Sequence, residues 1–215
     1  MQQGKIIEDC VRFVEKHPDY ENEVYRKLYN SILLWTVRFL ASRLEMTKGD
    51  EPAVEYLFKK DDGTKSLEAD LQTDYKNLMV STIGGTEVEV TNVAGGRADV
   101  LFRLSTERIV TEVKREGRDC SFESLTAEYS AQAADYQNVS GRLGFVLVLD
   151  QTTQDAGTPH ISALVKPTQL TRPGESTPRI LIFVKVPGER LTPSMLSKAA
   201  KKKGAQQRRD HKKKS

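Results

Sequence analysis

The sequence predicts an α/β fold with a central mixed β-sheet flanked by helices. Apolar residues recur at helical spacing through residues 1–60, whereas residues 86–114 alternate between apolar and polar side chains as strands do. A further helical stretch, residues 122–139, lies between this strand region and the wholly apolar run 145–149. A helix between two strands is typical of a crossover that joins parallel neighbours.

An N-terminal helical extension precedes the predicted core. Its helices are expected where apolar side chains recur every three or four positions: residues 6–14, 21–45 and 50–58. Pro18 separates the first two helices, and Asp50 with Pro52 is typical of the start of the third. The second helix carries a wide aromatic stripe, so it should pack against a large surface.

The core begins with a predicted helix at residues 66–80 and continues as an antiparallel meander. Its strands are expected at residues 86–91, 98–104 and 108–114. After the helix 122–139, further strands are expected at residues 143–149, 161–165 and 179–186. The domain organisation that we predict is a helical extension (1–60), a core (61–190), and a short helix with a basic tail (191–215).

Charge is distributed unevenly along the chain of 215 residues. Residues 198–215 carry nine basic and one acidic side chain, whereas the rest of the chain carries 24 basic and 29 acidic side chains. Such a tail is typical of contact with nucleic acid, and a disordered solubilising terminus is the alternative. The sequence has no transmembrane run and no secretory h-region, so we expect a cytoplasmic protein that does not enter a membrane.

The clearest chemical pattern lies in the predicted meander. Glu112 and Lys114 are two positions apart on a strand and share one face, while Val113 points to the opposite face. Asp99 opens the neighbouring strand and can lie beside Glu112. Converging carboxylates suit Mg²⁺, and a lysine beside them can orient a water. The Glu-x-Lys triplet alone is uninformative, because about 1.4 are expected by chance, and ordinary cross-strand ion pairs are the alternative.

Further polar residues can reach such a site from two helices. Glu68 flanks the apolar stripe of helix 66–80 and can supply a third carboxylate, with an exposed helix acid as the alternative. Gln132 and Tyr136 lie one turn apart on helix 122–139. There Gln132 can bond a phosphate or a water at the metal, and the alternative is a helix that simply packs Tyr136 on the sheet.

These motifs, in this order, resemble the restriction-endonuclease-like PD-(D/E)XK nuclease superfamily. The segments that carry the resemblance are GGRADVL (95–101), IVTEVKR (109–115) and QAADY (132–136). The last resembles the Q-x-x-x-Y motif of recombination helicase–nucleases and related defence nucleases. Ala98 stands where the family has a proline before the aspartate, and the resemblance does not explain residues 1–60.

The resemblance implies a restriction-endonuclease-like core and a metal-dependent active site. It places Mg²⁺, for which Mn²⁺ can substitute, on Asp99 and Glu112, with Glu68 as a third ligand and the main-chain carbonyl of Val113 completing the site. It assigns activation of the attacking water to Lys114. The residues expected to position phosphates or substrate are Gln132, Tyr136, Arg97, Arg115 and Arg118.

The predicted function is Mg²⁺-dependent hydrolysis of phosphodiester bonds in nucleic acid, DNA rather than RNA, in restriction, repair or anti-phage defence. One alternative is a catalytically silent nucleic-acid-binding module with the same fold. Another is a docking subunit in which residues 1–60 bind a partner protein or a second copy of the chain. The sequence contains no P-loop motif, so any ATP-driven motion would come from another chain.

Overall fold

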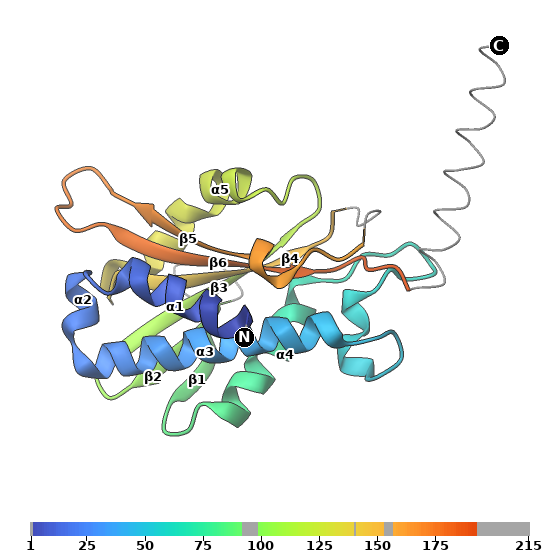
Figure 1. Cartoon of the computed structure of the whole chain (residues 1–215), viewed down its shortest axis with the longest axis horizontal. Helices are drawn as coiled ribbons and strands as arrows, with labels where there is room; N and C mark the ends of the chain where they lie inside the picture. The colour runs from blue at the N-terminus through green and yellow to red at the C-terminus, as the bar shows by residue number, and fades with distance from the viewer. Residues whose placement is uncertain (1, 92–98, 140, 153–156, 193–215) are drawn as a thin grey trace, which may run out of the picture.

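A mixed β-sheet lies between two helical layers in the computed structural model, which describes residues 2–91, 99–139, 141–152 and 157–192 (Figure 1). The helices are α1 (Gln2–Val14), α2 (Pro18–Glu21), α3 (Glu23–Glu45), η1 (Pro52–Leu57), α4 (Glu68–Thr82), α5 (Phe122–Asp135), η2 (Tyr136–Val139) and η3 (Ile161–Ala163). The strands are β1 (Glu87–Thr91), β2 (Asp99–Leu104), β3 (Glu107–Glu116), β4 (Leu143–Asp150), β5 (Val165–Leu170) and β6 (Arg179–Pro187). None of the helices in these ranges is long and apolar enough to cross a membrane.

The six-stranded sheet has the order β1-β2-β3-β4-β6-β5. Strands β1 to β3 form the antiparallel meander that the sequence predicts. Strand β4 runs parallel to β3, with α5 between them in the chain, which confirms the predicted crossover. Every residue of β4 is buried, as expected for a central strand that is covered on both faces.

The N-terminal helices cover one face of the sheet together with α4. Ile32, Leu33 and Val37 of α3 are buried in the same apolar cluster as Leu147 of β4. Tyr25 anchors the start of α3, because its hydroxyl donates to the main-chain carbonyl of Leu143 over 2.8 Å. The segment predicted as an extension therefore supplies much of the core on this face, while α5 lies on the other face (Figure 1).

Some predicted boundaries differ from the structure. The strand expected at 161–165 lies at Val165–Leu170, and residues 161–163 form the 3-10 helix η3. Buried Ile161 and Leu164 are three positions apart, which fits a helical turn better than a strand. The segment 50–58 forms the 3-10 helix η1, and the helix expected at 122–139 ends at Asp135 and continues as η2. The predicted C-terminal helix lies outside the described residues.

The C-terminal end of α5 is held by a buried arginine of β6. Arg179 is only 4% exposed, and its guanidinium donates to the carbonyl of Ala134 and to Asn138 Oδ1. It also forms an ion pair with Glu175, and this hydrogen bond raises the pKa of Arg179. The unsatisfied carbonyls at the end of a helix attract such a cation.

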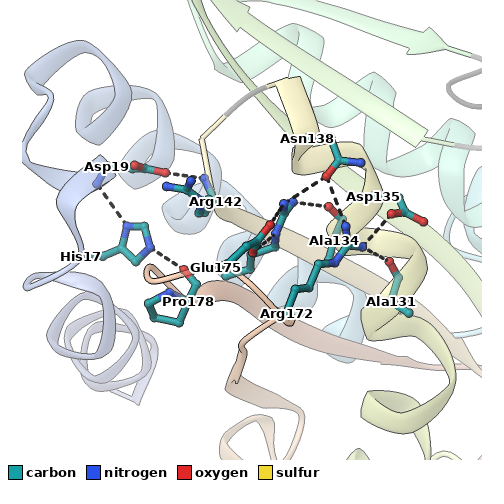
Figure 2. A network of polar contacts seen from close by, with 11 residues as sticks. His17, Asp19, Ala131, Ala134, Asp135, Asn138, Arg142, Arg172, Glu175 and Pro178 are labelled. Atoms are coloured by element: carbon teal, nitrogen blue, oxygen red, sulfur yellow. Dashed lines mark hydrogen bonds and ion pairs between the residues drawn. The ribbon is translucent and has the colours of Figure 1, made fainter.

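A second arginine extends this network, which Figure 2 shows from close by. Arg172 donates to the carbonyl of Ala131 over 2.8 Å and pairs with Asp135 at 2.7 Å. From the other helical layer, His17 Nε2 donates to the carbonyl of Pro178 over 2.8 Å. The loop between β5 and β6 therefore joins the end of α5 to the N-terminal helices.

Replacing Arg179 by methionine should lower the free energy of unfolding by about 2–3 kcal/mol, because the carbonyl of Ala134 and the partly buried Glu175 lose their donor. Urea unfolding followed by circular dichroism measures this loss. The matched variant Arg172→Met removes a more exposed arginine and should cost about 1 kcal/mol or less. Equal losses in the two variants would contradict the central position of Arg179.

Candidate functional site

The strand register places Asp99 opposite Glu112, as the sequence predicts. These residues are Cα partners in the antiparallel pairing of β2 with β3. The hairpin between the strands is tight, and Ser105 adopts a positive φ of 56° in its turn. The backbone of Asp99 is described, whereas its side chain lies outside the described part of the structure, as does the whole of Arg97.

Glu112 and Lys114 form a buried ion pair. Lys114 Nζ contacts Glu112 Oε1, and the two side chains are 12% and 1% exposed. Val113, between them, is buried in the apolar core of the opposite face, which confirms the predicted alternation. A charge that is buried to this extent is unfavourable without a partner, so the pair cannot be treated as an ordinary surface ion pair.

The ion pair faces the α5 side of the sheet. Glu112 is the parallel partner of Val146 in β4, and Val146 belongs to the apolar cluster beneath α5. Lys114 and Glu116 follow at every second position of β3, so the three charged residues form one row. This row leads from the middle of the sheet to the carboxyl end of β3.

A polar pocket of about 670 Å³ opens at that end of the row. Its lining comes from the segment before α4, from β3 and the loop after it, from α5, and from the residue that follows β4: Lys65, Arg115, Glu116, Gly117, Arg118, Asp119, Ser124, Glu128, Tyr129 and Gln151. Lys65 Nζ donates to the carbonyl of Gln151 over 3.3 Å, and Arg115 donates to the carbonyl of Ser66 over 3.3 Å. The carboxyl ends of parallel strands are a common place for ligand sites in α/β proteins.

The acids of this pocket are engaged by neighbouring protein groups. Glu116 accepts hydrogen bonds from the Arg118 backbone N–H at 2.6 Å and from the Tyr129 hydroxyl at 3.1 Å. Burial opposes ionisation of Glu116, but these bonds outweigh it and hold its pKa below the ordinary value. Burial and the charge of Glu116 raise the pKa of Tyr129. Asp119 accepts from both the backbone and the hydroxyl of Ser121. Both the acids and the cations Lys65 and Arg115 of this pocket are therefore hydrogen-bonded to neighbouring protein groups.

Glu68 is the first residue of α4 and is half-buried. Just before it, the carbonyl of Ser66 accepts from Arg115 and from Gln151 Nε2, so the chain enters α4 across the carboxyl ends of β3 and β4. Leu71, one turn later, is buried in the core of the opposite face from the ion pair. The structure thus brings Glu68 to the same end of the sheet as the pocket.

Gln132 and Tyr136, which were expected one turn apart on a single helix, lie in two different elements, because α5 ends at Asp135 and η2 begins at Tyr136. Gln132 is exposed on α5, and Tyr136 begins η2 with a side chain that lies outside the described part. The buried side of this segment continues instead from Ala133 through Ala134 to Gln137. Gln137 was not predicted, although its spacing from these buried alanines follows the helical period.

The donor chemistry of the site fits a hard divalent cation. Mg²⁺ prefers oxygen ligands and is usually held by one or two carboxylates with water, a role that Glu112 and the opposing Asp99 can fill. Among the described side chains, no group of three or more His, Cys, Asp or Glu residues could hold a metal, and the Asp99 side chain is not in that set.

Comparison with known proteins identifies no family for the chain. No protein-family model, no curated protein and no solved structure matches it. The resemblance to PD-(D/E)XK nucleases remains a prediction from the motifs, and function has to be argued from the geometry of the site.

The variant Lys114→Met should lower the free energy of unfolding by about 3 kcal/mol, because it leaves the Glu112 carboxylate buried without its cation. Adding Glu112→Gln should recover most of this loss, since the remaining groups are neutral. Urea unfolding of the wild type, both single variants and the double variant yields the coupling energy. A coupling energy near zero would mean that the pair is open in solution.

Proposed function

We propose that the chain is a Mg²⁺-dependent nuclease with a restriction-endonuclease-like core that hydrolyses phosphodiester bonds, with DNA as the expected substrate. The observation that carries this proposal is the buried pair of Glu112 and Lys114 with Asp99 at the opposing position of the adjacent strand. A structural ion pair has no need for a third charged residue at that position, whereas phosphodiester hydrolysis uses all three.

The order of elements supports the same proposal. Helix α4, with Glu68 at its start, precedes the meander that carries Asp99, Glu112 and Lys114, and α5 then crosses to the parallel strand β4. The motifs resemble those of PD-(D/E)XK nucleases in this order. The Ser66 carbonyl, bound by Arg115, brings the start of α4 close to the carboxyl end of β3.

In this mechanism Glu112 and Asp99 would hold Mg²⁺, with the main-chain carbonyl of Val113 as a further donor. The metal supplies Lewis-acid polarisation of the phosphate and a water of lowered pKa. Lys114 would leave Glu112 and donate a hydrogen bond to the attacking water, which orients the water in line with the scissile bond. Its ammonium also stabilises negative charge that develops on the phosphate.

The cations around the pocket would bind the phosphates that flank the reacting one. Arg115 and Lys65 already reach the pocket, and the row Glu112, Lys114, Glu116 connects it with the ion pair. Phosphate contacts of this kind position a strand without reading its sequence. Site preference would therefore depend on other parts of the chain or on a partner.

The first test incubates the purified protein with supercoiled plasmid, linear duplex DNA and single-stranded RNA, in Mg²⁺, Mn²⁺ or EDTA. We expect metal-dependent cleavage that falls on the order of 100-fold or more in Asp99→Asn and in the double variant Glu112→Gln/Lys114→Met. The double variant is preferred to Lys114→Met alone because it should keep the fold. Lys166→Met is the matched control, since Lys166 is an exposed lysine that pairs with Glu123 at 3.0 Å.

Metal binding separates the possible reasons for an absence of cleavage. If the wild type binds Mn²⁺ and Glu112→Gln does not, the site is intact and a partner or activating signal is missing. If the wild type neither cuts nucleic acid nor binds Mn²⁺, the nuclease proposal is wrong. The chain would then be the nucleic-acid-binding or docking module.

Removing residues 198–215 should weaken binding to duplex DNA by about 10-fold or more at 0.1 M salt. The salt dependence of the binding constant should also become shallower, because fewer counterions are released when cations are lost. The matched control keeps the length of the tail but replaces its lysines and arginines by glutamine. Unchanged affinity after truncation would identify the tail as a solubilising terminus.

A further inference from the structure

Gln137 of η2 is a buried amide without a hydrogen-bond partner. Its side chain belongs to a residue that is 5% exposed, and neither Nε2 nor Oε1 finds a partner. More than nine in ten buried polar groups are hydrogen-bonded, so an orphaned amide needs an explanation. The Nε2 donor and the Oε1 acceptor are therefore both unused in this arrangement.

The amide lies directly over the start of β4. A Cβ atom added to Gly144 would lie 2.9 Å from Gln137 Nε2 and 3.4 Å from the carbonyl oxygen of Val110. Gly144 thus leaves the space that Gln137 fills. Because side chains alternate along a strand, this position shares the α5 face with Val146, about 7 Å farther along β4.

That position makes Gln137 a neighbour of the proposed active site. Val146 is the register partner of Glu112 in β3, and the cluster that contains Val146 lies beneath α5. The Gln137 amide and Glu112 therefore lie on one face of the sheet, and Glu112 is two residues, or about 7 Å, farther along β3 than Val110, whose carbonyl oxygen borders the same space. A glutamine and a glutamate side chain that extend toward each other can together span this interval, so the Gln137 N–H can donate to the Glu112 carboxylate when both side chains turn.

The backbone around Gln137 is held firmly in place. The next residue, Asn138, accepts from Arg172 at 3.2 Å and from Arg179 at 3.0 Å (Figure 2). Arg179 also binds the carbonyl of Ala134. The network fixes the segment but leaves the Gln137 amide unsatisfied.

We propose that Gln137 is the positioning residue for Glu112, a role that the exposed Gln132 cannot share at its position on α5. When Lys114 turns from Glu112 toward the substrate, the Gln137 amide donates to the Glu112 carboxylate and keeps it oriented for the metal. This inference rests on the proposed nuclease function. Hydrogen bonds to ligating carboxylates tune metal affinity in this way.

The test uses Gln137→Met, which keeps the length of the side chain but removes the amide, with Gln169→Met, at an exposed position of β5, as the matched control. Mn²⁺ affinity of the full-length protein should fall about 10-fold in Gln137→Met. Its melting temperature without metal should rise by about 2–4 °C, because a buried unsatisfied amide has been removed. Gln169→Met should change neither quantity.

The combination of weaker metal binding with unchanged or higher stability is not expected from a purely structural residue. Unchanged Mn²⁺ affinity in Gln137→Met, beside a wild type that binds the ion, would overturn the inference and leave the nuclease proposal standing. A lower melting temperature with unchanged affinity would show Gln137 to be a packing residue. A wild type that binds no Mn²⁺ would overturn the nuclease proposal and this inference with it.

Discussion

Strand β3 must bury apolar side chains on one face and charged side chains on the other, and the two helical layers differ because of this requirement. On the first face, Val113 and Ile109 join a large cluster built by α1, α3 and α4. On the second face, Glu112 and Lys114 are almost as deeply buried but have to be paired. Transfer of charges from water is so unfavourable that the second layer cannot cover them with apolar side chains alone.

The α5 layer covers the charged face of β3 with a small apolar interface, and hydrogen bonds from other parts of the chain hold the helix in place. Its buried residues include small side chains such as Ala133 and Ala134, which contribute less apolar area than the leucines and aromatic residues of α3. Arg179 and Arg172 compensate by binding the carbonyls at the end of the helix. The helix is thus positioned by hydrogen bonds at its end, and Glu116, the last residue of the charged row of β3, lines the pocket.

Sequence patterning predicts the parts of this structure that depend on local periodicity. The alternation around Val113 and the hairpin between β2 and β3 are enough to place Asp99 opposite Glu112. The face of α5 is harder to predict, because Gln132 and Gln137 are both polar and only the burial of the alanines distinguishes them. The pocket could not be predicted at all, since Lys65 and Tyr129 meet there from segments that are distant in sequence. The start of β5 was misplaced because Ile161, Ala163 and Val165 alternate as in a strand, whereas residues 161–163 form η3.

The pocket and the ion pair differ in how far the topology of the sheet accounts for them. The pocket forms where β3 and β4 end, so its location follows from the parallel topology and would persist in a protein that only binds nucleic acid. The ion pair does not follow from topology, because an apolar pair on the same face would pack without a desolvation penalty. The proposal of catalysis rests on this ion pair, which shares the α5 face of the sheet with the unpaired Gln137 amide. If Lys114 must leave Glu112 before metal binds, the observed pair is the resting arrangement of the site, and ligand has to displace it.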